Sequence, residues 1–99
     1  MADGLSILSM NVKGLRRRAK RRSAFNFFKQ RKFDIICLQE THITESVKDE
    51  WEREWKNGLV YNAGTPKSLG QVILFSNKFS EINVVASTSR FLAASVKNS

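Results

Sequence analysis

The sequence is poor in the residues that mark disulfide-bonded, repetitive or membrane-spanning proteins. Its 99 residues include one cysteine, Cys37, which excludes an internal disulfide. A single cysteine in an apolar run is typical of a buried thiol in a reducing compartment, so we expect an intracellular location. No apolar stretch approaches the roughly 18 residues of a membrane span, and residues 1–4 do not resemble a signal peptide. We therefore expect one small domain with no membrane partner.

Acidic residues are scarce in the first third of the chain. Residues 1–32 hold ten of the seventeen lysines and arginines but only one acid, Asp3, and the net charge of the whole chain is +8. This basic block favours a polyanion partner, of which nucleic acid is the commonest. On charge alone, a solvated helix face or a nuclear-import signal explains the block equally well, and the latter would place the protein in the nucleus.

The hydrophobic pattern predicts alternating strands and helices followed by a run of strands. In the helix over 16–32, Ala19, Ala24, Phe27 and Phe28 are expected to form the apolar stripe. In the second helix, Trp51 and Trp55 are expected to face the core rather than to stack on bases, and Asn57-Gly58 to end the helix. We expect a loop over 64–70, helices over 16–32 and 45–56, and strands over 5–10, 34–39, 59–62, 71–76, 81–86 and 90–96.

Two polar residues follow the first two predicted strands, Asn11 and Glu40. Because a helix follows each strand, the two strands are expected to be parallel neighbours whose carboxyl ends lie side by side, where α/β sheets bind ligands. An amide and a carboxylate there could share Mg²⁺, which usually takes one or two carboxylates and keeps several waters. Taken alone, the two residues fit a cap and a solvated acid better than a metal site.

A resemblance to a known family changes that balance. Leu5-Ser-Ile-Leu-Ser-Met-Asn-Val-Lys-Gly-Leu-Arg16 and Asp34-Ile-Ile-Cys-Leu-Gln-Glu-Thr-His42, at this distance from each other, resemble the first two strands of the exonuclease–endonuclease–phosphatase (DNase I-like) superfamily. Gly70-Gln-Val-Ile-Leu-Phe75 and Arg90-Phe-Leu resemble later strands. Within this superfamily, the sequence is most similar to the retrotransposon and apurinic-site endonuclease branch.

The resemblance implies a fold, an activity and roles for individual residues. The fold is α/β (α+β), the N-terminal portion of a four-layer sandwich in which one mixed sheet carries two helices and the second sheet is missing. Glu40 becomes the ligand of Mg²⁺, or of Mn²⁺ in its place, and Asn11 helps to position the metal and the scissile phosphate. DNA becomes the expected partner. Its predicted contacts are the basic residues Lys13, Arg16, Arg17, Arg18, Lys20, Arg21 and Arg22.

The chain departs from the family in two ways. Lys13 stands where the family usually has Asn or Asp, and it would either touch phosphate or weaken metal binding. Residues 1–99 match only the beginning of the domain, because the family's Asn-x-Tyr, Gly-Asp-x-Asn and Ser-Asp-His segments have no counterpart here. His42 cannot replace the last of these, and we expect it at the surface, where it could contact DNA. The expected result is a truncated domain with little or no nuclease activity alone.

Three functions and one structural consequence remain open from the sequence. The leading hypothesis is a retroelement-type DNA endonuclease fragment. The alternative is a small basic nucleic-acid-binding module without catalysis, which predicts salt-dependent binding with no metal requirement. A third hypothesis is a member of the same superfamily that cleaves phospholipid headgroups or inositol phosphates instead of DNA. In each case the sheet face meant for the second sheet would be an exposed apolar patch, so we also expect self-association through that face.

Overall fold

The computed structural model describes residues 4–64, 69–88 and 91–98. Within them the chain forms two helices and six strands in two sheets, which confirms the α+β class. Most of the predicted 64–70 loop and Arg90, the first residue of the last predicted strand, lie outside the described residues. The elements in order are β1 (Ile7–Asn11), α1 (Arg18–Gln30), β2 (Ile35–Gln39), α2 (Lys48–Trp55), β3 (Leu59–Asn62), β4 (Gln71–Phe75), β5 (Phe79–Ser87) and β6 (Leu92–Asn98).

The larger sheet is mixed and has the strand order β1-β2-β4-β3. Strands β1 and β2 are parallel and α1 connects them, as the sequence predicted. Their register pairs Ile7 with Ile35 and Asn11 with Gln39. Strand β4 runs antiparallel to both β2 and β3. The carboxyl ends of β1 and β2 therefore meet at one end of the sheet.

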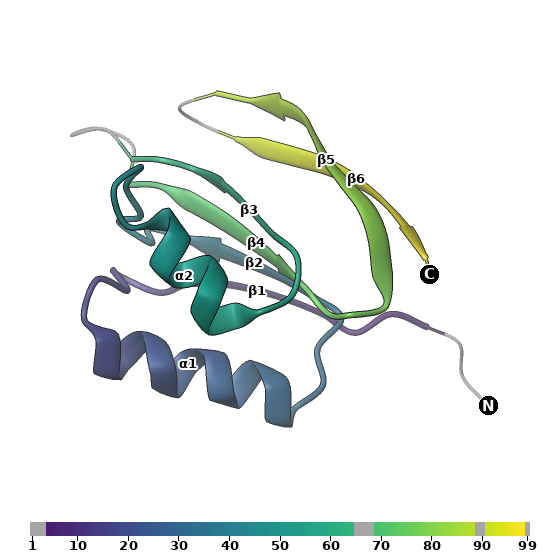
Figure 1. The fold of residues 1–99 in the computed structure, drawn as a ribbon, viewed down its shortest axis with the longest axis horizontal. Helices are drawn as coiled ribbons and strands as arrows, with labels where there is room; N and C mark the ends of the chain where they lie inside the picture. Colours follow the sequence, from purple (N-terminus) through teal and green to yellow (C-terminus); the bar gives the residue numbers. More distant parts are fainter. Residues whose placement is uncertain (1–3, 65–68, 89–90, 99) are drawn as a thin grey trace.

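Both helices cover one face of this sheet and bury the main core there (Figure 1). Trp51 and Trp55 are 0% and 2% exposed, which confirms them as core residues. On α1 the predicted stripe is confirmed at Phe28, which is buried, and at Ala24, which packs against the core. It is wrong at Ala19 and Phe27, which are exposed, and it missed the buried Phe25. The buried positions of α1 are spaced by four and three residues, the spacing of one helical face.

The last two strands do not join the mixed sheet but form a two-stranded antiparallel sheet of their own. A turn after β4 carries the chain to the opposite face of the large sheet, as Figure 1 shows. Phe79 of β5 packs there on Phe75 of β4 in a small second core with Val60. The expectation that the chain has no second sheet is therefore wrong: β5 and β6 form a small one, and its apolar side chains cover part of that face.

On this face the edge strand β1 is less covered by β5 and β6, with Ile7 60% exposed. Self-association through this surface stays a prediction. In the part of the chain that the structure describes, neither helix has the length and apolar character to cross a membrane.

Candidate metal site and basic hollow

Asn11 and Glu40 lie together at the carboxyl ends of β1 and β2, so their expected proximity is confirmed. The side-chain amide of Asn11 donates a hydrogen bond to Oε2 of Glu40. The Oδ1 atom of Asn11 accepts from the backbone N–H of Lys13 at 2.9 Å, which fixes the orientation of the amide. Oε1 of Glu40 has no hydrogen-bond partner among the described residues, so one carboxylate oxygen remains available to a ligand.

Backbone hydrogen bonds continue the β1–β2 pairing beyond the strands and fix the backbone that carries Asn11 and Glu40. Leu15 donates to the carbonyl oxygen of Thr41 at 2.9 Å, and Thr41 donates to Gly70 at 3.1 Å on its other side. Leu15 and Thr41 are 1% and 0% exposed. Glu40 is therefore held between two neighbouring segments whose anchors are buried.

Three residues at this end of the sheet adopt left-handed backbone conformations that side chains disfavour. The φ angles of Lys13, Glu40 and His42 are 52°, 54° and 61°. Each such residue costs about 1–2 kcal/mol relative to a right-handed conformation. Strain of this kind is concentrated at functional sites, and it turns the Glu40 side chain out of the strand's alternation. The sequence gives no signal for these conformations.

His42 packs against Gly14, which has a φ of 89°. A Cβ at Gly14 would approach Cδ2 of His42 to 3.0 Å, so the imidazole occupies the space that a larger residue would need. His42 is partly buried rather than freely exposed at the surface. This contact brings the only histidine of the chain to the same end of the sheet as Glu40.

Beside the pair is a hollow of about 380 Å³ that we call the basic hollow; it is lined by Lys13, Gly14, Arg16, Arg17, Lys20 and His42. No acid lines it. Nζ of Lys20 donates to the carbonyl oxygens of Val12 at 2.8 Å and Lys13 at 3.4 Å, which holds this cation over the loop after β1. Four cationic side chains without a carboxylate make the basic hollow a favourable place for an anion.

The predicted nucleic-acid contacts separate into three groups. Four of the seven line the basic hollow, and Arg18 and Arg22 line a different groove between the helices. The prediction for Arg21 does not fit the structure, since this residue is 2% exposed. Its guanidinium donates to both carboxylate oxygens of Glu54 and to the carbonyl oxygen of Leu15. The sequence prediction missed this burial because the acceptor, Glu54, comes from α2.

The donor set fits a hydrated Mg²⁺ but not a closed protein cage. Among residues 4–64, 69–88 and 91–98, no three His, Cys, Asp or Glu side chains gather to hold a metal. Glu40 is the one carboxylate at this point, with Asn11 beside it. Mg²⁺ commonly binds proteins through one or two carboxylates and retains several waters, so Oε1 of Glu40 can serve as its anchor.

Comparison with known proteins gives a transposon relative. No protein-family profile matches the chain. Over 85 residues, or 86% of its length, the chain is 35% identical to the Transposon TX1 uncharacterized 149 kDa protein of Xenopus laevis. It spans about 6% of the length of that protein. The chain is thus similar to a short part of a transposon protein, which indicates a transposon-related sequence.

Proposed function

We propose that this chain is the N-terminal part of a Mg²⁺-dependent DNA endonuclease domain of the exonuclease–endonuclease–phosphatase superfamily, of the retroelement type. The observation that carries the proposal is the Asn11–Glu40 hydrogen bond at the carboxyl ends of two parallel strands. Its position beside the basic hollow supports a phosphodiester substrate. The similarity to a transposon protein agrees with this assignment.

The chemistry follows from the roles of a few side chains. Glu40 would hold Mg²⁺ through Oε1 while the Asn11 amide orients the carboxylate through Oε2. A bound Mg²⁺ supplies Lewis-acid activation of the phosphoryl oxygen and stabilises the leaving oxyanion. Lys13 lines the basic hollow, which favours contact with phosphate over the alternative that it weakens metal binding. The basic hollow would hold a phosphate of the same strand.

We expect the chain alone to cleave DNA very slowly. A positioned general acid or base contributes about 10²- to 10⁴-fold to such a reaction. The aspartate–histidine segment that supplies it in the superfamily has no counterpart in this sequence. His42 packs on Gly14 and is not hydrogen-bonded to an acid among the described residues, so it does not reproduce that arrangement.

The test combines nicking of supercoiled plasmid with duplex binding, each measured with Mg²⁺ and with EDTA. We expect near-background nicking by the wild-type chain, together with tighter duplex binding when Mg²⁺ is present. Glu40→Ala should abolish the Mg²⁺ effect on binding. Glu81→Ala, which removes an exposed carboxylate paired with Lys97, should leave it intact. A Mg²⁺ effect of equal size in wild type and Glu40→Ala would refute the proposed site.

A nucleic-acid-binding module without catalysis is the second candidate. The absence of any acid from the lining of the basic hollow favours it, because anion binding there needs no metal. This candidate predicts duplex binding that is unchanged by EDTA and weakens steeply with salt. The same binding experiment therefore separates the two functions.

A further inference from the structure

A second basic surface lies between the two helices, away from Asn11 and Glu40. It is a hollow of about 510 Å³, which we call the helix groove. Its cationic lining residues are Arg18, Arg22 and Lys29 of α1 with Arg53 and Lys56 from α2 and its end. Two acids, Glu50 and Glu54, also line it.

Both acids already have ion-pair partners, and one of these partners is Arg18 of the helix groove itself. Glu50 pairs with Arg18 at 2.6 Å, and Glu54 pairs with the buried Arg21 at 2.5 Å. Within the described part of the chain, no ion pair involves Arg22, Arg53 or Lys56. With five cations and two acids in its lining, the helix groove has a surplus of positive charge.

Lys29 and Lys56 are two cations of the helix groove that lie near enough for the charge of one to affect the pKa of the other. Burial, followed by the neighbouring positive charge of Lys56, lowers the pKa of Lys29. Nζ of Lys29 lies 5.1 Å from the centre of the Trp55 ring and donates to the carbonyl oxygen of Glu54 at 3.3 Å. The fold thus holds two like charges near each other, and a bound anion would relieve their repulsion.

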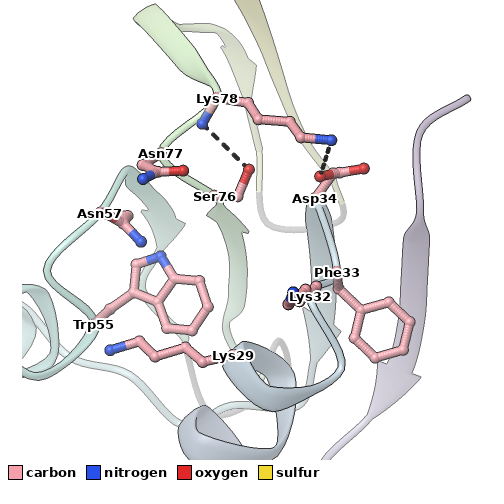
Figure 2. A pocket seen from close by; sticks show the side chains of 9 residues that line it. All are labelled: Lys29, Lys32, Phe33, Asp34, Trp55, Asn57, Ser76, Asn77 and Lys78. Atoms are coloured by element: carbon pink, nitrogen blue, oxygen red, sulfur yellow. Dashed lines mark hydrogen bonds and ion pairs between the residues drawn. The ribbon is translucent and has the colours of Figure 1, made fainter. Parts of the chain in front are cut away.

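A second hollow of about 340 Å³, the end hollow, adjoins the helix groove, since Lys29 lines both. Figure 2 shows Lys29, Lys32 and Lys78 around the end hollow together with Asn57 and Asn77. Its one acid, Asp34, pairs with Lys78 at 2.9 Å. The basic surface is therefore an extended track along the helix layer rather than a pocket for one small ion.

We propose that the helix groove and the end hollow together bind the phosphate backbone of a nucleic-acid strand, separately from the Asn11–Glu40 site. Two arginines, Arg22 and Arg53, suit phosphate because the planar guanidinium donates in a fork that matches its oxygens. None of the large apolar side chains that the described residues expose lines either hollow, whereas a membrane-binding surface needs such side chains. A row of separated cations fits a polymer of phosphates.

The experiment measures binding of a fluorescent 20-base-pair duplex (about two helical turns) in EDTA, in a Glu40→Ala background. Under these conditions neither metal nor cleavage contributes, so the result is independent of the proposed nuclease site. Arg53→Gln/Lys56→Gln should weaken binding on the order of ten-fold at low salt and lower the slope of log affinity against log salt by about two. Circular dichroism checks that each variant folds.

The matched control is Arg31→Gln/Lys97→Gln, which removes the same charge from residues that line neither hollow. We expect this pair to change binding by less than about two-fold. Equal losses in the two double variants, or no loss in Arg53→Gln/Lys56→Gln, would overturn the proposal. Arg22→Gln gives an independent variant on α1 and should weaken binding and lower the slope by about one.

Two further ligands identify the partner. Polyglutamate of matched charge and phosphatidylserine vesicles are offered to the same proteins. We expect the duplex to bind more tightly than either, with the Arg53 and Lys56 dependence confined to the duplex. Vesicle or polyglutamate binding that depends on Arg53 and Lys56 as strongly as duplex binding does would overturn the assignment to nucleic acid.

Discussion

Asp34 and Glu40 flank the same strand, β2, at its two ends, and their surroundings differ in almost every respect. Asp34 is 4% exposed and accepts hydrogen bonds from the Ser6 N–H at 2.8 Å and from Lys78 at 2.9 Å. The hydrogen bond from Lys78, followed by that from Ser6, holds the pKa of Asp34 below its ordinary value. Glu40 is partly exposed and has a left-handed backbone conformation, and among the described residues its side chain bonds only the Asn11 amide.

The contrast distinguishes a structural carboxylate from one that is available to a ligand. Both oxygens of Asp34 are engaged, and its backbone carbonyl oxygen accepts from Ser76 at 2.9 Å, so it joins β1, β2 and the end of β4. Glu40 leaves an oxygen open at a point where the backbone is strained. Buried polar groups normally have partners, and strain is tolerated where a function needs it. The same contrast separates the buried Arg21 of α1 from the exposed Arg17, which directly precedes the helix.

The largest effect is expected from Arg21→Ala. It removes a buried guanidinium and leaves Glu54 and the Leu15 carbonyl oxygen without their donors, so the free energy of unfolding should fall by about 3 kcal/mol. The paired control is Arg17→Ala in the basic hollow, which should change the free energy of unfolding by less than about 0.5 kcal/mol. Urea denaturation measures both. Similar losses in the two variants would contradict the assignment of Arg21 to the core.

Asp34→Ala comes next. The substitution leaves the partly buried Ser6 N–H without its acceptor and removes the partner of Lys78, and we expect a loss of about 2 kcal/mol in the free energy of unfolding. Urea unfolding followed by circular dichroism is the measurement. A loss below about 0.5 kcal/mol, the range of ordinary surface substitutions, would mean that Asp34 does not join the strands as described.

Lowering the pH should remove the stabilisation by the Asp34 carboxylate, with a smaller effect than the Asp34→Ala substitution. Because the pKa of Asp34 is lowered in the folded state, its stabilisation is present above the ordinary value of 3.8 and is lost as the pH falls through the lower folded-state pKa. The difference in melting temperature between wild type and Asp34→Asn should therefore be constant near neutral pH and should narrow below about pH 4. A difference in melting temperature that widens in acid would mean that folding raises the pKa of Asp34, which would contradict this account.

The smallest stability effect belongs to Glu40→Ala. Its carboxylate has one hydrogen bond, to the exposed Asn11 amide, so we expect a change of less than about 0.5 kcal/mol in the free energy of unfolding. The same urea series used for Asp34→Ala gives the comparison. A loss as large as that of Asp34→Ala would show that Glu40 is also structural, and the contrast between the two ends of β2 would fail.

The sequence predicted those features that depend on local pattern and connectivity. The parallel pairing of β1 and β2 followed from the helix between them, and it placed Asn11 beside Glu40. Trp51 and Trp55 followed from their helical spacing. These predictions held because strand alternation, helix period and crossover rules act over short stretches of chain.

Features that depend on tertiary packing were missed. The burial of Arg21 depends on Glu54, which α2 brings from 33 residues away. The separate β5–β6 sheet depends on the direction of the turn after β4, and the helix groove depends on α2, which brings Arg53 and Lys56 to the same hollow as the cations of α1. A charge pattern along one helix does not reveal which of its cations meet an acid from another element.

The most direct test of the central claim is a Mn²⁺ titration followed by NMR of the side-chain amides. If Asn11 and Glu40 hold a divalent metal, the paramagnetic ion should broaden the Asn11 amide signals first, before those of Asn57 and Asn77 at the other end of the sheet. Mg²⁺ in excess should restore them, and Glu40→Ala should remove the selectivity. Broadening that is equal at all three asparagines, or unchanged in Glu40→Ala, would contradict a metal site at the carboxyl ends of β1 and β2.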